Sequence, residues 1–241
     1  MDAAIGEMVQ ALTAQHLLES TTIIITAKHG QSPIDPNRFF PIPGHSANPT
    51  SPANLLAAAG LVPPVEIAGA GPTEDDISRL WLSPGNTTAT NTVEAVNLLE
   101  VEMNAKNAGI GEILYFGTLE TMFNAPGVPL VNGPCCALLL GGDPRTPDII
   151  VAPNIGVIYT GSAKKQEEHG GFAFDDTNVM LLVSNPDLAP RTVTTWVETP
   201  QVAPTILQIL GLDPTSLDAV RMEGTPALPE LFGEGQDQDQ Q

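Results

Sequence analysis

Two histidines lie where an imidazole could reach a metal ion or a substrate. His29 follows the short β-branched run Thr22–Thr26 and precedes a glycine. His169 lies in a polar, glycine-rich turn, Glu167–Gly171, which leads to the apolar run Val179–Val183. Because glycine has no side chain, an imidazole beside it is sterically free to reach a ligand. These two histidines are therefore the first candidates for metal binding or acid–base chemistry.

The segments around His29 predict an α/β fold. The first 20 residues carry apolar side chains at helical spacing, and Thr22–Thr26 reads as a strand buried on both faces because its apolar residues do not alternate with polar ones. In an open α/β sheet, polar residues just past the carboxyl end of a central strand line the ligand crevice. Lys28 and His29 occupy that place.

The rest of the chain divides by composition into a core and an inserted lobe. We expect residues 1–33 to form core α/β structure, 34–133 a cap-like α+β lobe, 134–232 the remaining core, and 233–241 a disordered tail. Ser51-Pro52 before an apolar run, with Gly60 after it, predicts a capped helix. Pro204–Leu210 predicts another helix, ended by Gly211.

Composition excludes several classes of function. The formal net charge of −19 argues against binding a nucleic-acid polymer, which needs clusters of Lys and Arg. A small phosphorylated substrate remains compatible, since a bound cation reverses the local field. No apolar run is long enough to span a membrane, and the N-terminus lacks the pattern of a signal peptide. We expect a soluble chain of undecided compartment, whose parent protein could still be exported.

Four segments together resemble one enzyme superfamily. Thr26–Pro33 reads Thr-Ala-Lys-His-Gly-Gln-Ser-Pro, and Glu168–Gly171 reads Glu-His-Gly-Gly; Gln201–Leu207 and Arg221–Thr225 follow in the same order as in the superfamily. This arrangement resembles the alkaline phosphatase superfamily, and most closely its type I phosphodiesterase and nucleotide pyrophosphatase branch. The resemblance implies a partial alkaline-phosphatase-like α/β/α sandwich and hydrolysis of phosphoester bonds.

The resemblance also implies a metal centre. In that superfamily, two divalent cations, usually Zn²⁺, assist an in-line attack on phosphorus by a Thr or Ser alkoxide. His29 matches the histidine of one metal site, and His169 matches the histidine of the other. Imidazole is a normal zinc ligand in its neutral form. The implied substrate is a small phosphorylated molecule.

The chain departs from the superfamily pattern in three respects. Lys28 stands where an aspartate ligand is expected, and no Thr or Ser nucleophile and no Asp-x-x-x-His pair can be identified before His29. An ammonium group cannot coordinate a metal ion. Lys28 could bind a phosphate oxygen, abolish one metal site, or pair with a nearby carboxylate. We therefore expect the chain alone to be inactive, and its partners to include a missing N-terminal half.

Four carboxylates near His169 could support that histidine by hydrogen bonding: Glu167, Glu168, Asp175 and Asp176. For each of them, a solvated position in a turn is the more common case.

Two readings of function stay open: a metal-dependent phosphoester hydrolase, or a non-catalytic remnant or binding protein of the same fold. A sulfatase or phosphotransferase relative is a weaker third option. A sulfatase should carry a Cys-x-Pro-x-Arg motif, which Cys135 and Cys136 do not form.

Overall fold

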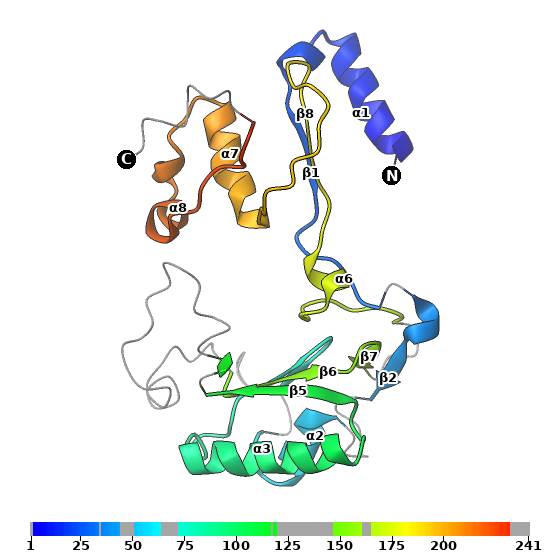
Figure 1. The fold of residues 1–241 in the computed structure, drawn as a ribbon, viewed down its shortest axis with the longest axis vertical. Helices are drawn as coiled ribbons and strands as arrows, with labels where there is room; N and C mark the ends of the chain where they lie inside the picture. Colours follow the sequence, from blue (N-terminus) through cyan, green and yellow to red (C-terminus); the bar gives the residue numbers. More distant parts are fainter. Residues whose placement is uncertain are drawn as a thin grey trace. The chain divides into compact units, whose positions relative to one another are not determined.

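The computed structural model divides the chain into two compact units (Figure 1). The terminal unit comprises Met1–Lys28 and Val179–Gln241, and the central unit comprises His29–Asn178. The structure describes residues 2–33, 35–43, 51–63, 72–116, 118–119, 147–160 and 165–231. It contains both helices and strands, so the mixed α/β class expected from the sequence is confirmed.

The terminal unit opens with the predicted helix and strand. Helix α1 (Asp2–Ala14) is followed by the short 3-10 helix η1 (Leu18–Ser20) and strand β1 (Ile23–Thr26). Strand β1 pairs antiparallel with β8 (Leu181–Ser184), and Ile23 faces Ser184 in the register. The prediction that this strand is buried on both faces is wrong, because its residues are half-buried or exposed. Within the described residues β1 has one strand partner, which cannot cover it fully.

The second part of the terminal unit is a short helical segment. It contains η3 (Thr199–Gln201), α7 (Val202–Ile209), η4 (Pro214–Ser216) and α8 (Asp218–Glu223). The predicted helix stop after α7 is confirmed, since Gly211 has φ of 69°, a left-handed value that glycine adopts without strain.

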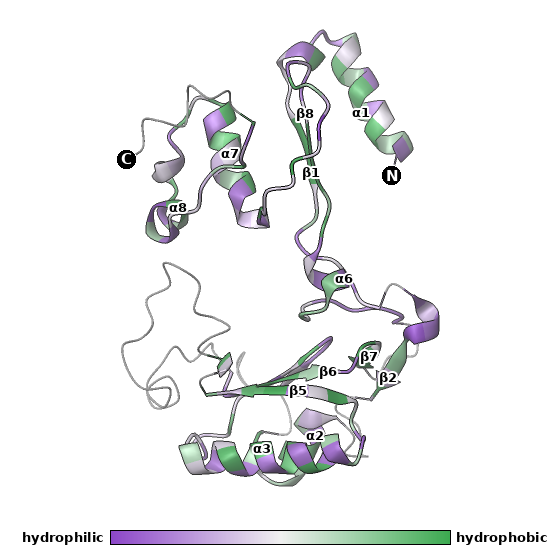
Figure 2. Cartoon of the chain, in the orientation of Figure 1, coloured by the Kyte–Doolittle hydropathy of each residue, from purple (hydrophilic) through white to green (hydrophobic). Residues whose placement is uncertain are grey.

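A four-stranded antiparallel sheet organises the central unit. Its strands lie in the order β3 (Thr73–Glu74), β4 (Ser78–Leu80), β6 (Ile149–Pro153) and β5 (Ile110–Tyr115). Helices α2 (Pro52–Ala58) and α3 (Ala89–Asn104) lie together beside this sheet (Figure 1). In Figure 2, α3 carries both green apolar and purple polar residues along its length, as expected for a helix with one face against a core.

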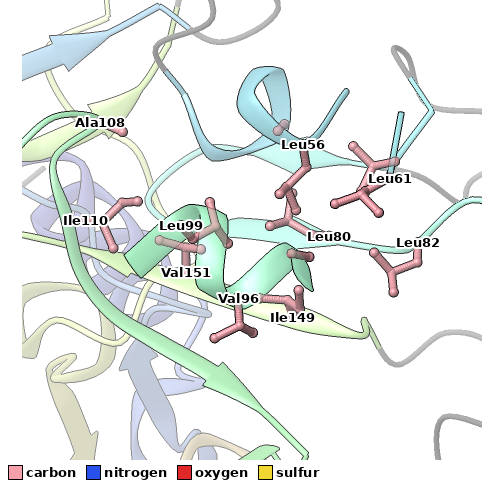
Figure 3. Packing of buried hydrophobic residues seen from close by; sticks show 13 residues of the cluster. Leu56, Leu61, Leu80, Leu82, Val96, Leu99, Ala108, Ile110, Ile149 and Val151 are labelled. Atoms are coloured by element: carbon pink, nitrogen blue, oxygen red, sulfur yellow. The ribbon is translucent and has the colours of Figure 1, made fainter. Parts of the chain in front are cut away.

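The main core lies between these helices and the sheet (Figure 3). Its fully buried side chains include Leu56 of α2, Leu80 of β4, Leu99 of α3 and Ile149 of β6. The predicted helix start is confirmed at α2, where the Ser51 hydroxyl accepts from the Asn54 N–H and proline occupies the first turn. The core of the chain is therefore concentrated in the central unit.

The remaining described elements are short. Strand β2 (Phe40–Ile42), preceded by η2 (Pro36–Arg38), pairs in parallel with β7 (Val157–Tyr159). Helix α6 (Phe174–Thr177) lies shortly before β8. In the ranges that the structure describes, the strands form three small sheets.

The predicted domain limits stay predictions. The boundary at residue 133, both cysteines, His45 and the tail at 233–241 lie outside the described residues. The central unit includes much of the predicted lobe at 34–133, together with β6 and β7. None of the described helices combines the length and apolar character needed to cross a membrane.

Candidate metal centre

The central unit brings His29 and His169 together. Their ring centroids lie 3.8 Å apart, and the ring planes are 20° from parallel. Two backbone hydrogen bonds join the segments that carry them: the Ser32 N–H donates to the Glu168 carbonyl, and the Glu168 N–H donates to the Ser32 carbonyl, each at 2.9 Å. This short antiparallel bridge positions two histidines that are far apart in the sequence.

Gly30 fixes the position of His29. Its N–H donates to the Asp176 carbonyl at 2.6 Å, which ties the segment to α6. A Cβ atom at Gly30 would lie 1.8 Å from the Asp175 carbonyl oxygen, so any side chain here would push the two segments apart. Glycine is required beside the candidate histidine because the backbone at Gly30 approaches the backbone at Asp175 closely.

The hydrogen bond of His29 decides which nitrogen is available. Nδ1 of His29 lies 2.7 Å from the Gly30 carbonyl oxygen. Since a carbonyl can only accept, Nδ1 must carry the proton when the ring is neutral, and Nε2 then has a free lone pair. A neutral imidazole oriented by a hydrogen bond on its other nitrogen is the usual form of a metal-binding histidine.

The donor chemistry fits a divalent cation such as Zn²⁺, but the two rings do not converge on one ion. Imidazole lone pairs lie in the ring plane, and here the planes are stacked and nearly parallel. This arrangement suits two histidines that contribute to neighbouring ions rather than sharing one. In the part of the chain that the structure describes, no group of three or more His, Cys, Asp or Glu side chains could hold a metal ion.

Lys28 is the last residue of the first segment of the terminal unit, and its side chain is exposed. Among the described residues, no carboxylate forms an ion pair with Lys28. Its three proposed roles stay predictions.

Two buried carboxyl groups share the Ser32 hydroxyl. Ser32 Oγ lies 3.0 Å from Asp176 Oδ2 and 3.3 Å from Asp76 Oδ2. Both aspartates are only 3% exposed. Burial, followed by the contact with Asp176 and its negative charge, raises the pKa of the Asp76 carboxyl to about 8.

This cluster revises the expectations for the carboxylates near His169. The sequence favoured a solvated position for each carboxylate. This expectation is wrong for Asp176, which is buried, and right for Glu167, which is exposed. Glu168 is half-buried and pairs with Lys165. Sequence reasoning missed Asp76 altogether. The only local signal was the run of three acids Glu74–Asp76 shortly before strand β4, which does not by itself show that Asp76 is buried.

A family model for type I phosphodiesterase / nucleotide pyrophosphatase matches residues 1–175, a range that includes Lys28, His29 and His169. No curated protein sequence matches the chain. Among solved structures, human ectonucleotide pyrophosphatase / phosphodiesterase 5 is similar, with a TM-score of 0.50 and 14% identity. The match covers 88% of this chain and 46% of that one, so the chain spans less than half the length of the human protein. At this identity the likeness concerns the fold alone.

Proposed function

Because the chain belongs to the type I phosphodiesterase / nucleotide pyrophosphatase family, we propose that it serves metal-dependent hydrolysis of phosphoester bonds as the histidine-bearing part of the metal site. The observation that supports this proposal is the stacking of His29 on His169 at 3.8 Å. We further propose that the chain forms part of an alkaline-phosphatase-like α/β/α sandwich, with the central unit carrying the inserted lobe.

In this proposal, His29 and His169 are ligands of two neighbouring divalent cations, with zinc the best match to imidazole. When bound, such ions lower the pKa of an attacking hydroxyl group and neutralise charge on the leaving oxygen. The protein's own contribution is positional. The Gly30 carbonyl holds His29 in the tautomer with a free Nε2, and the Ser32–Glu168 bridge keeps His169 beside it.

Lys28 is the candidate contact to substrate. An ammonium group at the position of a metal-binding aspartate cannot hold a cation, yet it offers three donors to a phosphate oxygen. The substrate class proposed is a small phosphorylated molecule. A nucleic-acid polymer would be repelled by the net charge of −19.

A non-catalytic role is the second candidate. It is favoured by the absence of an identifiable Thr or Ser nucleophile before His29 in the sequence, and by Lys28 at a ligand position. In this case the chain would bind a phosphorylated ligand or a partner without hydrolysing it. A separate polypeptide segment that carries a Thr or Ser nucleophile would be required in the first case and dispensable in the second.

The test combines metal content with activity. We expect the purified chain to bind added Zn²⁺, quantified by mass spectrometry, and to lose this binding in the double variant His29→Ala, His169→Ala. The single variant His16→Ala is the matched control, since His16 lies in the terminal unit and is exposed. Wild-type protein without zinc, or a double variant that keeps its zinc, would contradict the assignment of the two histidines.

Activity on bis-p-nitrophenyl phosphate separates the two candidate functions. Zinc binding without turnover supports an incomplete site, and supplying the N-terminal half of a family relative in trans should then restore hydrolysis. Zinc binding without turnover under both conditions favours the non-catalytic role. Turnover by the chain alone would show that it contains an unrecognised nucleophile.

A further inference from the structure

The Ser32, Asp76 and Asp176 side chains form a second polar cluster in the central unit. They come from three segments: the turn after His29, the turn between β3 and β4, and helix α6. Ser32 Oγ lies 3.0 Å from one aspartate oxygen and 3.3 Å from the other, and the two carboxyl groups are within hydrogen-bonding reach of each other. We call these three side chains the aspartate cluster.

The hydrogen bonds of the cluster are incomplete. Asp76 and Asp176 are each 97% buried, and within the described residues the Oδ1 atom of each has no hydrogen-bond partner. No Lys or Arg in those residues forms an ion pair with either carboxylate. Buried carboxylate oxygens without a partner are rare, because each loses its hydration without compensation. Two such oxygens in one cluster therefore indicate a missing positive charge.

We propose that Ser32, Asp76 and Asp176 bind a hard divalent cation of the Mg²⁺ and Ca²⁺ class. Carboxylate and hydroxyl oxygens are the ligands these ions prefer, and the set contains no nitrogen or sulfur that would favour zinc. Neighbouring oxygens around an octahedral ion at about 2.1–2.4 Å are roughly 3.0–3.4 Å apart. The separations of Ser32 Oγ from Asp176 Oδ2 and Asp76 Oδ2, 3.0 and 3.3 Å, fall in that range, which also includes ordinary hydrogen bonds.

The backbone at Gly171 approaches the aspartate cluster closely. A Cβ atom on Gly171 would lie 2.6 Å from Asp176 Oδ2 and 2.9 Å from Asp76 Cβ, so only glycine lets this turn approach. Gly171 follows His169 by two residues, and Ser32 follows His29 by three. A cation held here would therefore stabilise both histidine-bearing turns.

A shared proton is the rival explanation. The Asp76 carboxyl has a raised pKa, so it could be protonated at neutral pH and donate to Asp176. A proton held between the two carboxyl groups would partner one oxygen of each aspartate. This arrangement predicts stability that depends on pH but not on Mg²⁺ or Ca²⁺, which separates the two explanations in one experiment.

The experiment uses the full chain in a Trp196→Phe background, which leaves the half-buried Trp81 of the central unit as the only tryptophan. Thermal unfolding is followed by fluorescence after treatment with a chelator, with and without about 5 mM MgCl₂ or CaCl₂. We expect one of the two salts to raise the midpoint by about 4 °C or more, because a ligand of the folded state stabilises it. Isothermal calorimetry on the same protein should show saturable binding.

Three variants complete the test. Ser32→Ala removes one ligand oxygen without adding volume and should weaken binding roughly tenfold. Asp76→Asn should abolish the shift of the midpoint. Asp75→Asn is the matched control and should keep the full shift, because the Asp75 carboxylate is partly exposed and pairs with Arg79. The double variant His29→Ala, His169→Ala should also keep the shift, which separates this cation from the zinc of the proposed function.

Equal shifts in Asp76→Asn and wild type would overturn the proposal. So would the absence of both binding and a shift in wild-type protein whose stability still depends on pH. If Asp76→Asn does not fold, the calorimetric affinity of Ser32→Ala decides, and an affinity equal to that of wild type counts against the proposal.

Discussion

Asp148 has a buried carboxyl group with a defined structural task. Its Oδ2 accepts from the Leu82 N–H at 2.7 Å, and burial raises the pKa of the Asp148 carboxyl above the ordinary value of 3.8. The folded chain therefore binds this proton more tightly than the unfolded chain does. The contribution of Asp148 to stability is present at low pH and is lost as pH rises from 3.8 through the folded-state pKa.

We expect Asp148→Asn to increase the free energy of unfolding at neutral pH. The amide oxygen can still accept from Leu82, and no charge has to be buried. Asp148→Ala should instead lose about 1–3 kcal/mol, because it leaves the Leu82 N–H buried without an acceptor. Urea unfolding of the three proteins at acidic and neutral pH tests this ranking. An Asn variant less stable than wild type at neutral pH would show that the carboxylate has a partner other than Leu82.

The residues of the candidate site differ in how far the sequence revealed them. His29 and His169 could be selected because each stands beside a glycine near an apolar run, and that pattern can be recognised in the amino-acid sequence alone. Asp76 could not, since its burial depends on Ser32 and Asp176, which approach it only through the tertiary fold. Lys28 could be recognised as a departure from a motif, but a motif does not supply the direction of its side chain.

At the scale of elements, α3 carries much of the central core. Leu99 is fully buried, whereas the adjacent Leu98 is 39% exposed. We expect Leu99→Ala to lower the free energy of unfolding by about 2–5 kcal/mol, through lost burial and the cavity left behind. Leu98→Ala should cost less than about 1 kcal/mol, because its side chain is largely solvated. Chemical denaturation of both variants measures the difference.

The two leucines make a matched pair, since the helix, the residue type and the substitution are the same. Equal losses of stability would mean that the face of α3 carrying Leu98 is also covered in solution. A small loss for Leu99→Ala would mean that the core repacks around the cavity.

Helix limits were more predictable than strand environments. Ser51, Pro52 and Gly211 act through local backbone chemistry, so their positions at helix ends follow from the sequence. The burial of β1 does not follow from the sequence, because an apolar β-branched run is compatible with any number of neighbouring strands. Only the pairing with β8, far along the chain, decides how much of β1 is covered.

At the scale of the whole molecule, buried apolar surface is unevenly distributed. Among the described residues, Pro204 and Leu228 are the only buried apolar side chains of the terminal unit. Helix α1 has no buried residue, and Trp196 is 84% exposed. Apolar burial is the main stabilising contribution to folding, so the terminal unit should open more easily than the central unit.

Native-state hydrogen exchange tests this prediction. We expect amides of β1 and α7 to exchange with a lower free energy of opening than amides of β6 and α3, and to respond earlier to added denaturant. Leu99→Ala provides the control, because it should lower protection in the central unit first. Equal opening energies in both units would show that they unfold as one cooperative body.

The pairing of β1 with β8 has a consequence for how this chain can be taken apart. Both crossings between the units lie just beyond that pair, where Thr26 faces Leu181, and the Gly30 N–H reaches the Asp176 carbonyl at 2.6 Å. The central unit thus begins and ends at neighbouring points, as a domain inserted into a hairpin does. Cutting it out and joining the strands with a tight Asn-Gly turn would leave an ordinary β-hairpin. The excised central unit would contain both the two histidines and the aspartate cluster.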